Sequence, residues 1–176
     1  MIKGELTGLR ALEKDDLMLL RDWRNIQSFR RNFREVKELN LTNQENWFLR
    51  TSSSPNDFMF IIIDLKTNEP IGAAGLLYTN WIIRSADFSF YIGKDNLYID
   101  ETYAYDAAKT LIEYGFNNLN LNKIWMELYE FDTVKFNFFT EKFEFQKDGL
   151  LRQNCFEQGK YWDSNIISLL AKDFKK

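Results

Sequence analysis

Two carboxylates on separate predicted strands are the groups in this sequence best placed to accept a proton. Alternating apolar and polar residues predict a strand over residues 84–93, with Asp87 on its more polar face. The same alternation predicts a strand over residues 123–130 and places Glu127 on the corresponding face. Each carboxylate could act as a general base, or it could pair with a basic side chain on a hydrated sheet face.

The absence of histidine narrows the chemistry that the chain can perform. It excludes Ser-His-Asp hydrolysis, Cys-His nucleophilic sites and nearly all catalytic zinc sites, so we expect no metal. The only cysteine, Cys155, cannot form an intrachain disulfide, which favours a reducing compartment. No apolar segment resembles a signal peptide, and the longest apolar run, residues 58–63, is far shorter than the ~20 residues that span a bilayer. We therefore expect a cytoplasmic protein without a membrane partner.

A cluster of basic residues stands out against an acidic chain. The net charge of −3 argues against nucleic acid as a partner, because that binding depends on a basic surface. Residues 21–37 nevertheless carry a net charge of +4, from six basic and two acidic side chains. The six basic residues are Arg21, Arg24, Arg30, Arg31, Arg34 and Lys37. This segment is either a solvated helix face or a site for an anionic ligand.

These residues are positioned by strands and helices of one domain, residues 1–176. The length is typical of a single domain, and no repeat or linker divides it. The predicted elements are a strand over 5–12, a helix over 13–26, a second helix capped by Thr42 and followed by a turn at 51–57, strands over 58–65, 70–78 and 84–93, a helix over 101–119, a strand over 123–130, a helix over 133–143 and two final strands, the last over 160–173. This order predicts a mixed α/β (α+β) fold in which residues 58–93 form an antiparallel meander.

Several short motifs occur in a fixed order along the chain. They are Trp-Arg-Asn at 23–25, Pro-Ile-Gly-Ala-Ala-Gly-Leu at 70–76, Tyr-Ala-Tyr-Asp-Ala at 103–107, Glu-Tyr-Gly-Phe at 113–116, Leu-Asn-Leu-Asn-Lys-Ile at 119–124, Glu-Lys-Phe-Glu-Phe at 141–145, Asp-Gly-Leu-Leu-Arg at 148–152 and Gly-Lys-Tyr-Trp-Asp at 159–163. In this order they resemble the GCN5-related N-acetyltransferase (GNAT) family. The resemblance covers nearly the whole chain and is strongest to the branch of ribosomal-protein N-terminal and amino-sugar acetyltransferases.

The resemblance implies both a fold and an activity. The family fold is a twisted, mostly antiparallel sheet of about 6–7 strands flanked by about four helices. The implied activity is direct transfer of an acetyl group from acetyl-CoA to a primary amine of a small molecule or peptide. A homodimer is an assembly that the resemblance allows.

The resemblance also implies roles for individual residues. Asp87 and Glu127 would deprotonate the amine, because the family's two strands separate here and hold the acetyl-pantetheine arm between them. Four arginines would face the acceptor, namely Arg24, Arg30, Arg31 and Arg34. The coenzyme would contact three segments, which are Phe90, Tyr91 and Ile92, then Ile99, Asp100, Glu101, Thr102, Tyr103 and Ala104, and finally Thr133 and Phe136.

The loop before the predicted helix at 101–119 departs from the family. Family members have a glycine-rich loop there, whose N–H groups hold the coenzyme pyrophosphate, but residues 97–102 contain no glycine. Asp100 would either repel the phosphates or cap the helix. Two further positions differ, since Thr133 and Glu144 stand where the family often has Asn and Gly. Thr140 replaces a tyrosine that many members use as a general acid.

Two functions are therefore predicted. The first is an N-acetyltransferase, with the amino group of a nucleotide-linked sugar favoured as acceptor because arginine suits phosphate. A protein N-terminal amine comes next. The alternative is a non-catalytic or regulatory binding module that keeps the fold but has a degenerate pyrophosphate loop.

Overall fold

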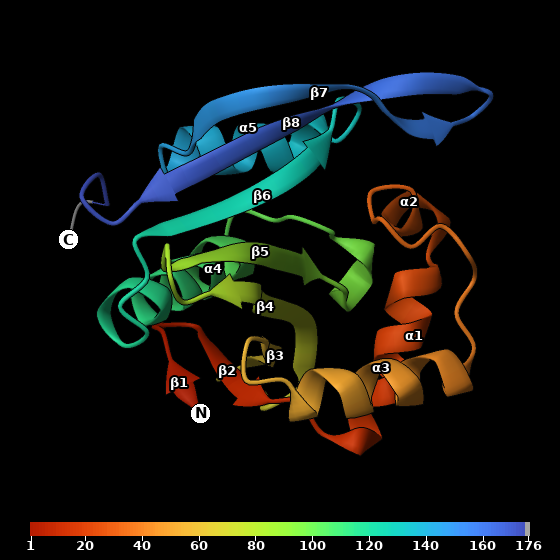
Figure 1. The fold of residues 1–176 in the computed structure, drawn as a ribbon. Coiled ribbons are helices and arrows are strands. Elements are labelled where there is room, and N and C mark those ends of the chain that lie inside the picture. The colour runs from red at the N-terminus through yellow and green to blue at the C-terminus, as the bar shows by residue number, and fades with distance from the viewer. Residues whose placement is uncertain (175–176) are drawn as a thin grey trace.

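A sheet of eight strands, in the order β1-β2-β3-β4-β5-β6-β8-β7, forms the centre of the computed structural model, which describes residues 1–174 (Figure 1). Neighbouring strands are antiparallel except β5 and β6, which are parallel. The strands are β1 (Ile2–Lys3), β2 (Thr7–Ala11), β3 (Phe58–Asp64), β4 (Pro70–Asn80), β5 (Ser85–Ile92), β6 (Lys123–Tyr129), β7 (Gln146–Glu157) and β8 (Lys160–Leu170). The mixed α/β fold is confirmed, with slightly more strands in the described residues than the expected six or seven.

Helices cover both faces of this sheet. The α-helices are α1 (Leu17–Asn25), α2 (Gln27–Arg30), α3 (Leu41–Ser53), α4 (Tyr103–Asn117) and α5 (Thr133–Lys142), and two short 3₁₀ helices are η1 (Lys14–Asp16) and η2 (Lys94–Asn96). α4 and α5 pack on one face, while α1 and α3 pack on the other (Figure 1). None of the helices within residues 1–174 is long and apolar enough to cross a membrane.

Alternation along the strands divides their side chains between these two layers. Phe88 and Phe90 of β5 belong to the larger core, beneath α4 and α5. Tyr91 belongs to the smaller core, beneath α1 and α3. The side chains of Asp87 and Glu127 line the same cavity as Tyr91, on the same face of the sheet. This confirms the strand faces predicted from the sequence.

The strand predicted over residues 5–12 is confirmed as β2, and the short strand β1 precedes it. β1 and β2 form a hairpin, and the N–H groups of Glu5, Leu6 and Thr7 at their connection donate to the carboxylate of Asp106 on α4. These three N–H groups are therefore tied to a helix rather than to a longer strand ladder.

The helix that was predicted to be capped by Thr42 is α3, and it begins earlier than predicted. Asn40 is the N-cap instead of Thr42, because its side chain accepts the N–H of Asn43 at 2.9 Å. The Asn43 side chain in turn accepts the N–H of Asn40 at 3.1 Å. This reciprocal pair is a capping box with Asn in place of the usual Glu or Gln, so the sequence pattern did not reveal it.

The sheet opens between β5 and β6. The two strands pair only over residues 85–87 and 123–125. Farther along, Ile92 of β5 pairs with Tyr98 in the loop after η2, while β6 continues its pairing with β8. The opening that results lies in the middle of the sheet and positions the candidate site.

Candidate active site

Asp87 and Glu127 lie where β5 and β6 separate. Asp87 is in the last paired register, opposite Trp125, and Glu127 is two residues farther along β6. Successive residues of a strand point to opposite faces, so Trp125 and Glu127 share a face with each other. The structure therefore brings together the two carboxylates that the sequence selected as proton acceptors, at the rim of one cavity.

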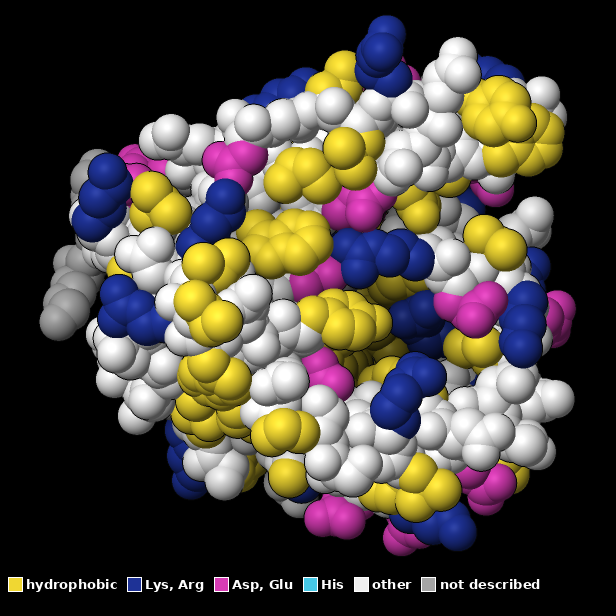
Figure 2. Space-filling view, viewed as in Figure 1, with side chains coloured by type: hydrophobic (Ala, Val, Ile, Leu, Met, Phe, Trp, Pro, Cys, Tyr) yellow, Lys and Arg dark blue, Asp and Glu magenta, His cyan; other side chains and the backbone are white. Residues whose placement is uncertain are grey.

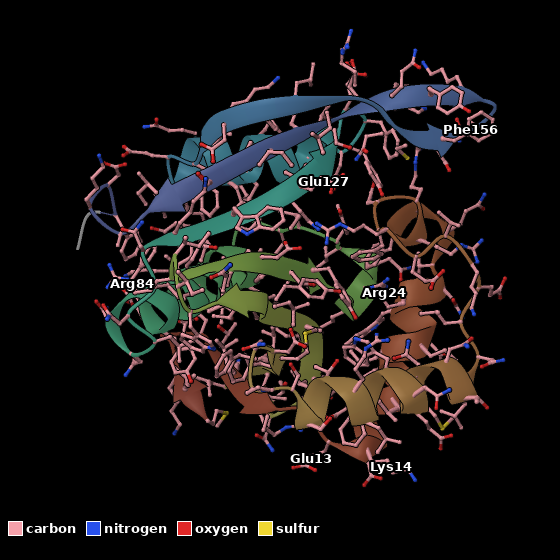
Figure 3. All side chains as sticks on the ribbon, viewed as in Figure 1. Glu13, Lys14, Arg24, Arg84, Glu127 and Phe156 are labelled. Carbon is pink, nitrogen blue, oxygen red and sulfur yellow. The ribbon has the colours of Figure 1, made fainter. Side chains whose placement is uncertain are left out.

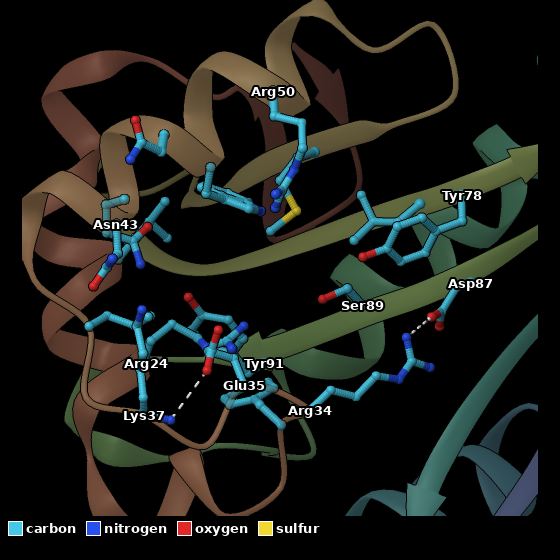
Figure 4. Close-up of a pocket in the computed structure, with 18 of the residues that line it drawn as sticks. Arg24, Arg34, Glu35, Lys37, Asn43, Arg50, Tyr78, Asp87, Ser89 and Tyr91 are labelled. Atoms are coloured by element: carbon cyan, nitrogen blue, oxygen red, sulfur yellow. Dashed lines mark hydrogen bonds and ion pairs between the residues drawn. The ribbon is translucent and has the colours of Figure 1, made fainter.

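This cavity has a volume of about 570 Å³ and lies between the sheet and helices α1 and α3 (Figure 4). Small-molecule sites commonly measure ~300–1,000 Å³, so it can hold a metabolite. Figure 2 shows basic and acidic side chains gathered around the hollow. The charged residues that line it are Arg24, Arg34, Glu35, Lys37, Arg50, Asp87 and Glu127.

Arg34 joins the two carboxylates. Its Nη1 donates to Oδ2 of Asp87 at 2.7 Å, and its Nε lies 3.4 Å from Oε2 of Glu127. Glu127 also accepts a hydrogen bond from Asn154 of β7 at 2.6 Å. Burial raises the pKa of Asp87 and the neighbouring charge of Glu127 adds to the rise, while Arg34 opposes it. A carboxylate with a raised pKa binds a proton more readily, as a general base requires.

Arg24 also lines the cavity, from the end of α1 (Figures 3 and 4). Its Cζ lies 3.7 Å from the ring centroid of Phe33, and its buried Nε has no hydrogen-bond partner among the described residues. Burial lowers the pKa of Arg24, and the charge of Glu35 only partly offsets this. A guanidinium in this environment is stabilised by any anion that enters the cavity.

The other two arginines assigned to the acceptor lie elsewhere. Arg30 forms an ion pair with Glu38 at 3.2 Å, and Arg31 lies 3.6 Å from Glu157 on β7. Neither residue is part of the cavity lining. The basic segment is therefore divided, with Arg24 and Arg34 facing the cavity and the other two arginines paired outside it.

A main-chain donor faces the opening between β5 and β6. The N–H of Ile92 donates to the carbonyl of Tyr98 at 2.8 Å, on the side of β5 away from β4. N–H groups two residues apart in a strand point in the same direction, so Phe90 directs its N–H into the opening and Tyr91 directs its N–H toward β4. Of the three β5 residues assigned to the coenzyme, Phe90 is therefore the one whose N–H is directed to polarise a carbonyl bound in the opening.

Asp100 caps the N-terminus of α4. Its carboxylate accepts the N–H groups of Thr102 at 3.0 Å, Tyr103 at 2.8 Å and Ala104 at 2.8 Å. Of the two roles that the sequence left open for Asp100, the structure has the cap. The donors that would hold a pyrophosphate therefore already hold an anion of the same chain, and a phosphate at this helix end has to displace Asp100. The neighbouring Glu101 is exposed and takes no part in this cap.

The start of α5 is the third segment assigned to the coenzyme. Thr133 is exposed there, and Phe136 packs against the larger core. The Thr140 hydroxyl donates to the carbonyl of Phe136 at 2.9 Å. Because that proton is engaged within the helix, Thr140 does not replace the family's tyrosine as an acid in this conformation.

Lys135 of α5 is a buried residue that the sequence analysis missed. Its Nζ lies 4.5 Å from the ring centroid of Tyr98 and 5.5 Å from that of Phe33. Burial lowers the pKa of Lys135 to about 8, and the charge of Arg24 adds to this, while Asp132 opposes it. Its one sequence signal is its position among the aromatic residues of α5, which does not show which way the side chain points.

The family model "Acetyltransferase (GNAT) domain" matches residues 7–136. The chain belongs to the GNAT acetyltransferase family. Among its relatives, the uncharacterized N-acetyltransferase p20 of Bacillus licheniformis is 30% identical over 115 residues, which cover 65% of this chain and 63% of p20. The chain therefore spans less than two thirds of p20. The SPbeta prophage-derived uncharacterized N-acetyltransferase YokL of Bacillus subtilis (strain 168) is 21% identical over 98% of this chain and 94% of YokL.

Solved structures with the GNAT fold resemble this chain over nearly its full length. The spermidine N-acetyltransferase of Vibrio cholerae, in complex with CoA and spermine, superposes with a TM-score of 0.86 at 24% identity, covering 96% of this chain and 97% of that one. A dodecameric structure of that enzyme gives a TM-score of 0.79 at 22% identity, covering 95% of each chain. At this identity, the likeness establishes the fold.

Proposed function

We propose that this chain transfers the acetyl group of acetyl-CoA directly to a primary amine held in the cavity. Family membership supports the reaction class, and the similar fold of an enzyme that binds CoA and spermine supports both the donor and a small-molecule amine as acceptor. The observation that carries the proposal is the placement of Asp87 and Glu127 at the opening of the sheet, on the wall of the cavity.

The reaction requires a neutral amine. A protonated amine that enters the cavity gives its proton to Asp87 or Glu127, directly or through water. An α-amino group, with a pKa of ~7.7–8.0, is already partly neutral at pH 7, whereas a lysine amine at ~10.4 is not. Without a histidine to assist, the site therefore suits weakly basic amines better than lysine side chains.

The transfer itself forms one bond and breaks one. The amine nitrogen attacks the thioester carbonyl carbon, and the negative charge that develops on the carbonyl oxygen is stabilised by the N–H of Phe90. The C–S bond then breaks, the attacking nitrogen releases its extra proton to water to give the neutral amide, and CoA leaves as a thiolate that takes up a proton from solvent. A thiol with a pKa near ~8.5 leaves without a strong acid, so the loss of the family's tyrosine at Thr140 is tolerable.

Arg34 competes with the acceptor for the carboxylates. Its guanidinium contacts both Asp87 and Glu127, where an acceptor ammonium would have to bind. Roughly half of the Arg34 side chain is exposed, so it can turn toward solvent when an acceptor enters.

The favoured acceptor is the amino group of a nucleotide-linked sugar, and a protein N-terminus is second. Arg24, Lys37 and Arg50 line the cavity away from the carboxylates and suit a phosphorylated ligand. An extended peptide would need a groove, whereas the charged residues here surround a cavity.

A non-catalytic binding module is the second candidate, and one observation favours it. The carboxylate of Asp100 occupies the N–H donors of α4 that would otherwise hold a pyrophosphate. If no phosphate can displace it, the chain does not bind the donor.

Two measurements together test these proposals. Calorimetry with acetyl-CoA is expected to show binding, and release of free CoA thiol is then followed with nucleotide-linked amino sugars and N-terminal peptides side by side. Acetyl-CoA binding with thiol release only in the presence of an amine supports the enzyme. Absence of acetyl-CoA binding by the wild type and by Asp100→Gly supports the module. Turnover with peptides alone would contradict the sugar preference but not the reaction.

A further inference from the structure

The cavity has two chemically different ends. Its carboxylate end consists of Asp87 and Glu127 with Arg34 between them. Its cationic end is formed by Arg24 from α1, Lys37 from the loop that follows α2, and Arg50 from α3. Figure 4 shows Arg24 and Lys37 at the opposite side of the cavity from Asp87, with Arg50 reaching in from α3.

The cationic end lacks matching anions. Glu35 is the acidic residue of the lining outside the carboxylate end, and its side chain accepts the main-chain N–H of Lys37 at 3.3 Å. Three positive side chains against one negative one leave an excess of two positive charges. Within residues 1–174, neither Arg24 nor Arg50 forms a hydrogen bond or ion pair with an acidic side chain.

Arg24 is the most informative of these cations. Its side chain is partly buried, its buried Nε has no hydrogen-bond partner, and its guanidinium lies against the ring of Phe33 rather than against a carboxylate. A buried N–H without an acceptor costs stability, and an anion in the cavity would supply the missing acceptor. Lys135, a second buried cation, lies on the same ring and increases the local positive potential.

We propose that the cationic end of the cavity binds a phosphate group of the acceptor, so that the acceptor is a phosphorylated small-molecule amine. The assignment rests on the proposed acetyltransferase function and names the substrate class of the same site. The amine lies at Asp87 and Glu127, and the phosphate lies at Arg24, Lys37 and Arg50.

The size of the charge excess favours phosphate over a carboxylate. A phosphate monoester carries about −1.5 to −2 charges at pH 7, which matches the excess of two, whereas a carboxylate supplies only one. Two arginines can each donate a pair of hydrogen bonds to phosphate oxygens. A polyamine such as spermidine has no anion to offer, and its second ammonium group would be repelled by Arg24 and Arg50.

Binding of inorganic pyrophosphate, measured by calorimetry with excess CoA present, tests the cationic end without requiring turnover. Excess CoA fills any donor site, so the remaining binding reports the cavity. Arg50→Gln is expected to weaken it by about 10- to 100-fold, the usual effect of losing one charge-assisted contact. Arg24→Gln is expected to do the same, and the exposed Arg50 covers the case in which the Arg24 variant fails to fold.

Arg21→Gln is the matched control, because Arg21 lies on the same helix as Arg24 but pairs with Asp22 outside the cavity. No pyrophosphate binding, or equal loss in Arg21→Gln and Arg50→Gln, would overturn the proposal. Binding that depends on Arg50 while no amine is acetylated supports the phosphate site and instead contradicts the acetyltransferase function.

Turnover then tests the acceptor class. The kcat/KM for glucosamine 6-phosphate is expected to exceed that for glucosamine by about 10-fold or more. Arg50→Gln should remove this difference, whereas the control Arg21→Gln should preserve it. Equal values for the two sugars in the wild type, or a preference for spermidine or peptides, would overturn the acceptor assignment.

Discussion

At the start of α4, three N–H donors hold the carboxylate of Asp100, whereas the cavity on the other face of the sheet contains cations that lack anions. The donor side of the site is thus satisfied by its own chain, and the acceptor side is not. An internally satisfied group stabilises the fold and must be displaced by a ligand, while an unsatisfied group weakens the fold and is completed by one. For the proposed acetyltransferase, we therefore expect the cavity, rather than the start of α4, to select the ligand.

The largest effect is expected at Lys135, the buried cation beside Arg24. A pKa lowered from 10.5 to about 8 corresponds to a folding cost on the order of 3 kcal/mol at pH 7. Lys135→Met should remove this cost and raise the free energy of unfolding by a similar amount, measured by urea denaturation. If the variant is no more stable than the wild type, the buried positive charge beside the cavity does not destabilise the fold. The contrast between the cavity and the start of α4 would then be wrong.

The pH dependence identifies the cause of that effect. Between about pH 8 and 10.5 the folded chain has lost the Lys135 proton while the unfolded chain still binds it, so this residue makes stability rise with pH in that window. The advantage of Lys135→Met over the wild type should therefore shrink across the window. Lys142→Met, an exposed lysine on the same helix, is the control and should show neither change.

The second effect concerns the carboxylate end. Asp87→Asn or Glu127→Gln should lower turnover at pH 7 by ~10²-fold or more while leaving acetyl-CoA affinity nearly unchanged, as loss of a general base would. Because Asp87 must be deprotonated and its pKa is raised, wild-type kcat/KM should fall as the pH decreases through that pKa.

The control is Asp148→Asn, which removes another paired carboxylate. Asp148 contacts Lys123 outside the cavity, so this variant should leave turnover unchanged. Wild-type rates in both site variants would make these carboxylates structural.

The convergence of the two carboxylates was predictable because it depends on strand alternation. The two-residue alternation placed Asp87 and Glu127 on one face, and the buried and partly buried residues of β6 alternate in the same way. Arg34 could not be placed in the same way, since it lies in a loop without periodicity and meets Asp87 only through tertiary folding. Lys135 was missed for a related reason, because the orientation of α5 decides whether a lysine is buried.

Asp100 shows a different limit of the sequence. A carboxylate before a helix predicts either a cap or a group that faces ligand phosphates, and both readings fit the same residues. The decision depends on whether three main-chain N–H groups converge on the side chain, which is a property of the loop conformation. Composition alone does not contain that information.

The third effect tests the donor side. Asp100→Gly removes the internal anion and frees three N–H donors, so acetyl-CoA should bind about 5- to 10-fold more tightly, as the removal of ~1 kcal/mol of competition predicts. The same change removes the cap and should lower stability by about 1 kcal/mol. Glu101→Gln makes the same charge change without a contact to the helix N–H groups and should affect neither quantity. Unchanged affinity in a destabilised Asp100→Gly would show that the pyrophosphate binds elsewhere.

The smallest effect is expected from the arginines outside the cavity. Arg30 and Arg31 pair with Glu38 and Glu157, and partly exposed ion pairs outside a core contribute only ~0–1 kcal/mol. The double variant Arg30→Ala with Arg31→Ala should therefore change kcat/KM for a phosphorylated amine by less than ~2-fold at high salt, where charges beyond the Debye length of ~3 Å at 1 M are screened. At low salt, removal of two positive charges can slow the encounter with an anionic acceptor, so a loss that disappears with added salt reflects steering and leaves the cavity boundary intact. A 10-fold loss that persists at 1 M salt would instead place the acceptor in contact with α2, and the division of the basic segment into cavity and surface arginines would be wrong.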